Sequence, residues 1–238
     1  MTFIKRVYKF IKNKVLRKAY IAGSDWILCF CDWFVDLRVC GRSLVRTVPS
    51  IYEDEKNGIG GTTTHSTHYV FLKRIFSHVT LDPSDMLLDV GCGKGRVLAF
   101  LLKQKYMCTL YGIEHNTEVG KIAVDWTKRY PQVNIIVGDA FQLDYNAYTV
   151  LTLARSFHPV TYELFVKQLE ETMRHPIRLV SWYDQGSMRF MRDRPGWRLD
   201  YHEIVNRIHG LKVAFCPQSF SIWTYNPCER KQQEAISK

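Results

Sequence analysis

The sequence lacks the cysteine arrangement that a structural metal site or a disulfide framework needs. The chain has seven cysteines, an odd number, and none of them forms a paired C-x-x-C spacing with an accompanying histidine pattern. They are Cys29, Cys31, Cys40, Cys92, Cys108, Cys216 and Cys228. We therefore expect no zinc site. A positively charged leader with a clean apolar stretch and a small-residue cleavage site is also missing, so we expect a reducing, cytoplasmic setting.

Long hydrophobic runs without charge are absent as well. Residues 20–37 come nearest to a membrane span, but Asp25, Asp32 and Asp36 interrupt them, and carboxylates are costly in hydrocarbon. We expect a helix here that is buried or lies at an interface. Internal repeats are absent, and 46% hydrophobic with 24% charged residues is an ordinary globular composition. The 238 residues should therefore build one principal core with an N-terminal extension.

Acidic residues are absent from residues 1–18, within a chain whose formal charge is +10. The basic residues of this segment are Lys5, Arg6, Lys9, Lys12, Lys14, Arg17 and Lys18. Its apolar residues lie between them at helical spacing: Phe3, Ile4, Val7, Tyr8, Ile11, Val15 and Leu16. The pattern predicts a basic amphipathic helix that lies on an anionic membrane or binds an acidic partner. The alternative is a helix that packs on the domain with its basic face in water. Net charge also admits nucleic acid, but no interleaved aromatic and basic motif supports it.

Helical and strand patterns alternate after a glycine-rich junction at residues 49–64. Helices are expected at residues 69–78, 94–105, 117–129 and 161–174. Strands are expected at residues 86–90, 109–113, 133–137, 149–154 and 177–183. This order predicts an α/β fold with a doubly wound, mostly parallel sheet and helices on both faces. Residues 197–205 and 211–223 should add a C-terminal antiparallel strand pair.

Three regions follow from this pattern. We assign residues 1–60 to a basic, helical N-terminal extension and residues 61–228 to the α/β domain. The remaining residues, 229–238, are rich in Lys, Gln, Glu and Ser, and we expect them to form a flexible tail.

A glycine motif lies where the first strand of the sheet ends and a helix starts. Residues 89–96 read DVGCGKGR, and glycines at such a turn let the backbone approach a ligand closely. The P-loop pattern is not present. A dinucleotide fingerprint would need a third glycine where Arg96 stands, which weakens a nicotinamide-binding interpretation.

The motif resembles the first motif of class I S-adenosylmethionine-dependent methyltransferases, and the resemblance extends over about residues 62–183. It implies that Glu114 accepts the ribose hydroxyls and that Asp139 accepts the adenine amine. Phe141 would cover the adenine ring, while Asp89 and the glycine backbone would surround the methionine part. The implied donor-binding set is Thr63, Thr64, Asp89, Gly91, Cys92, Gly93, Gly95, Glu114, Asp139, Ala140 and Phe141. The alternatives are a simple tight turn at the glycines and capping roles for Glu114 and Asp139.

Thr63 and Thr64 enter this set through a second, shorter resemblance. Residues 60–69, GGTTTHSTHY, are similar to a threonine-containing segment of histone lysine methyltransferases that lack a SET domain. The similarity implies only that one of the two threonines helps to hold the donor. The alternative is helix capping by a hydroxyl group.

The acceptor should approach at the end of the fourth strand. Many amino-group methyltransferases of this class carry an Asn/Asp-Pro-Pro-aromatic motif there, but residues 154–159 read ARSFHP. Nitrogen methylation is therefore not indicated. His158 is a candidate base for a hydroxyl acceptor, or else a loop histidine before a proline. Tyr183 and Asp184 follow the fifth strand and are expected at the same edge of the sheet.

A basic cluster further on suits a phosphate or carboxylate on the acceptor. It consists of Arg189, Arg192, Arg194 and Arg198. The alternative is a solvated surface. Together these patterns predict a methyltransferase that uses S-adenosylmethionine and an unidentified acceptor, at or near an anionic surface. The alternative is a nucleotide-fold binding protein, either NAD-dependent or catalytically silent.

Overall fold

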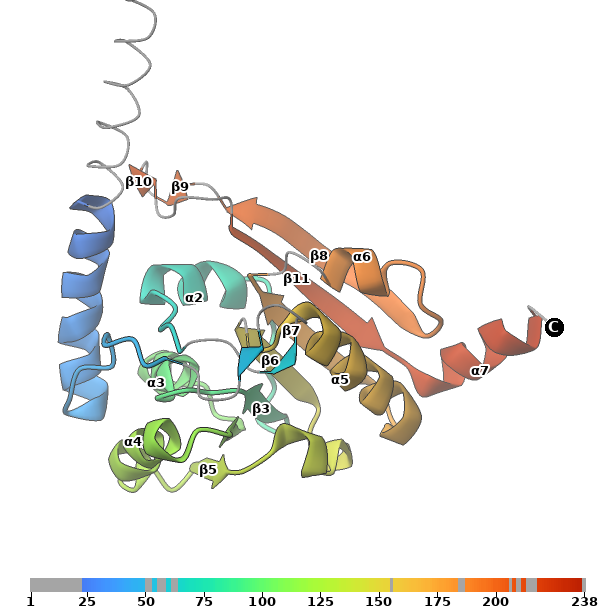
Figure 1. Cartoon of the computed structure of the whole chain (residues 1–238), viewed down its shortest axis with the longest axis horizontal. Coiled ribbons are helices and arrows are strands. Elements are labelled where there is room, and N and C mark those ends of the chain that lie inside the picture. Colours follow the sequence, from blue (N-terminus) through green and yellow to red (C-terminus); the bar gives the residue numbers. More distant parts are fainter. Residues whose placement is uncertain are drawn as a thin grey trace, which may run out of the picture.

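A computed structural model gives the arrangement of the chain (Figure 1). The structure describes residues 23–49, 53–54, 59–60, 64–154, 156–183, 187–205, 207–208, 211–212 and 218–236. The predicted amphipathic helix of residues 1–18 lies outside the described residues, as do Thr63 and Asp184.

A seven-stranded sheet forms the centre of the molecule, with the strand order β5-β4-β3-β6-β7-β11-β8. Five strands run parallel: β3 (Met86–Val90), β4 (Thr109–Glu114), β5 (Val133–Val137), β6 (Val150–Ala154) and β7 (Ile177–Trp182). The antiparallel pair is β11 (Gln218–Tyr225), which lies beside β7, and β8 (Trp197–Val205) at the edge. The doubly wound, mostly parallel sheet and the C-terminal antiparallel pair are confirmed.

Helices cover both faces of this sheet. They are α2 (Tyr69–Phe76), α3 (Arg96–Lys103), α4 (Thr117–Thr127), α5 (Pro159–Thr172), α6 (Ser187–Met191) and α7 (Pro227–Ile236). Short 3-10 turns, η1 (Ala140–Gln142) and η2 (Tyr145–Ala147), follow β5, and the two-residue strand pairs are β1 (Glu53–Asp54) with β2 (Ile59–Gly60) and β9 (Arg207–Ile208) with β10 (Leu211–Lys212). Local sequence explains the helix starts: α5 has proline at its first position, and the Asn116 side chain caps α4.

Two hydrophobic cores lie on opposite faces of the sheet, because side chains of a strand alternate between them. Leu87 points into the core beneath α2 and α3, and its neighbour Leu88 points into the core beneath α5. The strands are apolar on both faces, as expected for a parallel sheet that is covered on both sides.

The predicted helix before the domain is present. Residues 23–40 are helical, and we call them the N-terminal helix, drawn in blue at the edge of the domain in Figure 1. No helix among the described residues is long and apolar enough to cross a membrane. The acids that argue against a membrane span have a structural role, because Asp32 and Asp36 are buried at 2% and 0% exposure.

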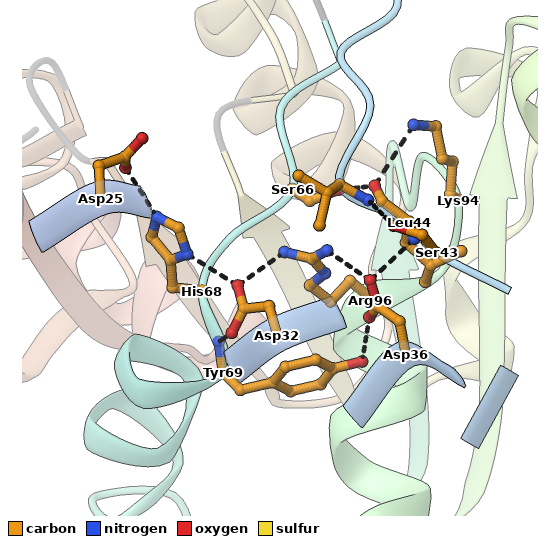
Figure 2. Close-up of polar contacts among 11 residues, drawn as sticks. Asp25, Asp32, Asp36, Ser43, Leu44, Ser66, His68, Tyr69, Lys94 and Arg96 are labelled. Atoms are coloured by element: carbon orange, nitrogen blue, oxygen red, sulfur yellow. Dashed lines mark hydrogen bonds and ion pairs between the residues drawn. The ribbon is translucent and has the colours of Figure 1, made fainter. Parts of the chain in front are cut away.

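A guanidinium bridges the two buried acids of the N-terminal helix (Figure 2). Arg96 Nη1 donates to Asp32 Oδ2 at 2.9 Å, and Nη2 donates to Asp36 Oδ2 at 2.7 Å. Asp36 also accepts hydrogen bonds from the Tyr69 hydroxyl and from the Leu44 backbone N–H, each at 2.8 Å. These bonds give each buried charge several partners, which it needs in a region without water.

His68, just before α2, joins the same network. Its Nδ1 lies 2.7 Å from Asp32 Oδ2, and its Nε2 lies 3.1 Å from Asp25 Oδ1. Burial alone lowers the pKa of His68, but the hydrogen bonds and charges of Asp32 and Asp25 outweigh it and raise the pKa. Cys29 lies near this pair, with ligand-type atoms of Asp25, Cys29 and His68 all within 4.8 Å of one another. The contacts of the histidine are those of an ion pair between the N-terminal helix and α2.

Two predicted elements differ from the structure. The predicted tail, residues 229–238, belongs largely to helix α7, which is capped by the Asn226 side chain and tied to the domain by Arg230, whose Nη1 donates to Glu170 O at 2.7 Å. Apolar residues do not recur at helical spacing in this segment, so the sequence pattern did not predict a helix there. The predicted strand at residues 211–223 is divided into β10 and the later β11.

We expect Arg96→Met to lower the free energy of unfolding by about 3–5 kcal/mol, because it leaves two buried carboxylates without their cation. Arg74→Met is the matched control, since the Arg74 side chain is 47% exposed and pairs with Glu203 at the surface. This control should cost about 1 kcal/mol or less. Urea unfolding measures both values.

The triple variant Asp32→Asn, Asp36→Asn and Arg96→Met removes the charges together and should regain part of the loss. A buried, coupled ion pair would be contradicted if Arg96→Met and Arg74→Met lowered the free energy of unfolding equally. It would also be contradicted if the triple variant lost the sum of the free energies that its three substitutions lose singly.

Candidate active site

The loop between β3 and α3 is built on glycines in the left-handed region. Gly91, Gly93 and Gly95 have φ values of 69°, 57° and 85°, a conformation that strains other residues. Neighbouring side chains also leave no room for a Cβ atom at two of these glycines. A Cβ on Gly91 would lie 2.6 Å from Ser156 Cβ, and one on Gly95 would lie 2.9 Å from a Trp126 ring carbon. The loop therefore needs glycine both for its dihedral angles and for close packing.

Internal hydrogen bonds hold this loop against the end of β4. Cys92 N–H donates to Ile113 O at 2.9 Å, and Gly95 N–H donates to Cys92 O at 2.8 Å. The Cys92 side chain is buried, 2.8 Å from the position that a Cβ on Gly112 would take. Of the predicted donor-binding residues, Cys92 thus turns its thiol into the core, and only its backbone belongs to the loop surface.

Glu114, at the end of β4, connects to the same loop. Its Oε2 accepts the Gly93 N–H at 2.8 Å, and its Oε1 accepts the Asn116 N–H at 2.8 Å. Burial raises the pKa of Glu114, and the two backbone hydrogen bonds oppose that rise. Asn116, not Glu114, is the N-cap of α4, so the helix-capping alternative does not describe Glu114.

The predicted adenine segment lies beside Glu114. Gly138 N–H donates to Glu114 O at 3.0 Å, which places the end of β5 next to the end of β4. Asp139 Oδ1 accepts the Phe141 N–H at 2.9 Å and caps η1, so one oxygen takes the loop-capping role. Ala140 is buried, and the half-buried Phe141 ring lies 5.9 Å from that of Phe157. The three motifs therefore gather at the carboxyl ends of β3, β4 and β5.

Asp89 is buried in the sheet, whereas the resemblance implies that it contacts the methionine part of the donor. It is 1% exposed, and its Oδ1 accepts the Thr152 hydroxyl at 2.8 Å, across from β3 to β6. Burial raises the pKa of Asp89 to about 7, and the nearby Glu114 charge adds to the rise. The Asp89 carboxyl group therefore links β3 to β6 next to the glycine loop.

Thr64 and Lys94 flank the loop from the N-terminal side. The Thr64 methyl carbon would lie 3.0 Å from a Cβ on Gly93, so Thr64 contacts the predicted loop. Lys94 Nζ donates to Leu44 O at 3.3 Å and to Arg46 O. Burial lowers the pKa of Lys94 to about 8, with Arg96 as the next cause. The sequence motif gave no sign that Lys94 would bind the segment after the N-terminal helix.

The ends of β6 and β7 contribute polar groups to the same edge of the sheet. Ser156, which sequence analysis missed, packs on Gly91 and donates its hydroxyl to Val90 O. His158 is the N-cap residue of α5, without a side-chain capping bond. Tyr183 follows β7 with a positive φ of 63° and donates its N–H to Ser219 O at 2.9 Å. Strained backbone of this kind often lies at functional sites.

Two of the four arginines of the predicted basic cluster are paired within the chain. Arg194 donates to both carboxylate oxygens of Glu170 at 2.6 and 2.8 Å, and Arg198 donates to Asp200 at 2.8 Å. Because these two guanidinium groups already have carboxylate partners, the bonds fit the solvated-surface alternative better than an anion-binding cluster.

Comparison with known proteins identifies the type of domain. Residues 87–176 match the family model described as a methyltransferase domain. An RNA methyltransferase from Salinibacter ruber, solved in complex with S-adenosyl-L-homocysteine, is 23% identical with a TM-score of 0.52, over 68% of this chain and 94% of that one. An S-adenosylmethionine-dependent O-methyltransferase from Thermotoga maritima is 16% identical with a TM-score of 0.51, over 70% and 68%. No curated protein matches the chain.

Residues 87–176 thus form a methyltransferase domain, and the chain shares the Rossmann-like fold of solved S-adenosylmethionine-dependent methyltransferases. The matched segment includes the glycine loop, Glu114 and the segment after β5. At these identities the solved structures establish the fold alone. The expected similarity of residues 60–69 to lysine methyltransferases stays a prediction.

We expect Glu114→Gln to weaken the binding of S-adenosylhomocysteine by about 1–3 kcal/mol, because it removes a charged acceptor from the predicted ribose site. Gln keeps a carbonyl acceptor for one of the two backbone amides. Glu118→Gln is the matched control, since the Glu118 side chain is 80% exposed and pairs with Lys121 at the surface. Titration calorimetry measures both affinities, and an unchanged affinity in folded Glu114→Gln would remove Glu114 from the site.

Proposed function

We propose that this protein transfers a methyl group from S-adenosylmethionine, by in-line displacement, to an acceptor that approaches over the ends of β6 and β7. The main support for the proposal is that two hydrogen bonds to Glu114 connect the glycine loop, the end of β4 and the segment after β5. Its side chain accepts the Gly93 N–H, and its backbone carbonyl accepts the Gly138 N–H. Ligands of such sheets bind at carboxyl strand ends near the point where strand order reverses, and β3 lies between β4 and β6 at that point.

The residues present fit S-adenosylmethionine. The three left-handed glycines place a loop without side chains at the end of β3, with Gly91 exposed, and the methionine part would lie against this loop. Each oxygen of Glu114 accepts one backbone amide and keeps a lone pair for a ribose hydroxyl. Asp139 uses Oδ1 for the Phe141 amide, so Oδ2 would accept the adenine amine, with Phe141 against the ring. When bound, the donor supplies a methyl group on a positively charged sulfur.

The acceptor side is proposed to consist of His158 and Tyr183. Methyl transfer from a sulfonium needs an oriented acceptor and a route for its proton. His158, the N-cap residue just before α5, would take a proton from a hydroxyl acceptor, and Tyr183 would orient the acceptor. The positive φ of Tyr183 supports this role, because a tyrosine held in that conformation costs about 1–3 kcal/mol.

The test is methyl transfer from radiolabelled donor to a lysate of the source cell, separated into protein, RNA, lipid and polar fractions. We expect label in one fraction and its loss in Glu114→Gln. His158→Ala and Tyr183→Phe should keep the affinity for S-adenosylhomocysteine within about twofold and reduce transfer by about 100-fold, as general-base or orienting residues do.

The alternative is that the chain is a nucleotide-fold binding protein, either catalytically silent or NAD-dependent. Binding of NAD without binding of S-adenosylhomocysteine would overturn the proposed donor. Donor binding with no label in any fraction would favour the silent binder, and label that persists in Glu114→Gln would show that the donor site is wrong. Because the RNA and lipid fractions are counted separately, the same experiment identifies the acceptor class.

A further inference from the structure

The N-terminal helix exposes a continuous row of large apolar side chains. We call it the aromatic face; its residues are Trp26 (70% exposed), Ile27 (49%), Phe30 (51%), Trp33 (40%), Phe34 (56%) and Leu37 (38%). Their rings contact one another along the helix: the centroids of Trp26 and Phe30 are 6.1 Å apart, and those of Trp33 and Phe34 are 5.1 Å apart. Contiguous exposed apolar surface of this kind marks an interaction site.

The aromatic face cannot turn inward. The opposite side of the same helix carries Asp25, Asp32 and Asp36, which contact His68 and Arg96 of the domain. Rotating the helix would break the buried ion pairs and strand their charges, which is strongly unfavourable. Surface helices usually expose the charged side, whereas this helix buries Asp32 and Asp36 together with apolar residues such as Val39 and leaves the aromatic face exposed. The arrangement therefore fixes six apolar side chains toward the outside of the domain.

We propose that the aromatic face docks on an anionic lipid bilayer, with the basic residues of positions 1–18 reinforcing the contact. Trp and Phe are favoured at the boundary of headgroups and acyl chains, where a helix lies flat in the interface. The sequence immediately before the helix has seven basic and no acidic residues in positions 1–18.

The charge of that segment decides between a bilayer and an apolar protein groove. Basic residues near an anionic bilayer each strengthen binding, and they act together over an extended surface. An apolar groove would be filled by the aromatic face alone and would gain nothing from seven cations. The proposal does not rest on methyl transfer, because it concerns a side of the N-terminal helix that faces away from the domain.

Co-sedimentation of the full chain with vesicles tests the proposal. The vesicles are phosphatidylcholine with or without phosphatidylglycerol. We expect binding to the anionic vesicles, reduced at least about tenfold by the pair Trp26→Ser and Phe30→Ser, because each lost ring removes favourable burial. The matched control is Leu164→Ser on α5, which changes a side chain that is 51% exposed outside the aromatic face and should leave binding unchanged. Deleting residues 1–18 should also weaken binding, and added salt should weaken the full chain more than the truncated one.

Tryptophan fluorescence gives a second, direct readout. Of the six tryptophans, Trp26 and Trp33 are exposed, while Trp126, Trp182, Trp197 and Trp223 are buried. Quenching by brominated lipid should therefore arise from the aromatic face. The variant Trp26→Phe and Trp33→Phe should keep vesicle binding and lose the quenching.

Three results would overturn the proposal. One is vesicle binding that survives both serine substitutions while deletion of residues 1–18 abolishes it, which would assign binding to the basic segment alone. Another is a wild-type chain that sediments with the vesicles but whose tryptophan fluorescence is not quenched by brominated lipid. The third is a dimer in lipid-free solution that the serine substitutions dissociate and whose formation prevents vesicle binding, which would make the aromatic face a contact between two copies of the chain.

Discussion

The buried ion pairs of Arg96 with Asp32 and Asp36 are the interaction on which the rest of the structure depends. Taking these charges out of water costs several kcal/mol per ion unless each finds well-placed partners. The fork of the guanidinium donates to both acids, while the Tyr69 hydroxyl and the Leu44 amide donate to Asp36. Arg96 is also the first residue of α3, directly after the last glycine of the loop. One side chain therefore fixes both the N-terminal helix and the start of the helix that follows the glycine loop.

This arrangement gives the N-terminal helix two separate surfaces. Its carboxylates face the domain and act on the glycine loop, and its aromatic rings face outward. Lys94 strengthens the inner connection, because it binds the carbonyl of Leu44 in the segment that follows the helix. Docking on the outer surface would thus involve a helix that is bonded to the residue after the glycine loop. These bonds connect the N-terminal helix and the segment after it to the α/β domain.

Local patterns predicted the sheet and the order of its motifs but not the long-range partners of charged residues. Alternating periodicity located the strands, and Glu114 and Asp139 lie at neighbouring strand ends because parallel strands end at the same edge. The partners of Arg96 are 60 and 64 positions away in the sequence, so the motif could only show that a fingerprint glycine was missing. Cys92 and Asp89 were predicted at the donor by position, yet both side chains are buried. Helix α7 was missed because its stability comes from the Asn226 cap and Arg230 rather than from an apolar stripe.

Through its ion pairs with Arg96, the N-terminal helix positions the glycine loop. A double-mutant cycle with Asp36→Asn and Arg96→Met, read by calorimetric affinity for S-adenosylhomocysteine in variants that remain folded, tests this positioning most directly. We predict that each substitution weakens binding and that the double variant is little worse than either one, with a coupling energy of about 0.5–3 kcal/mol. Unchanged affinity in the folded single variants, or losses that simply add, would contradict the claim.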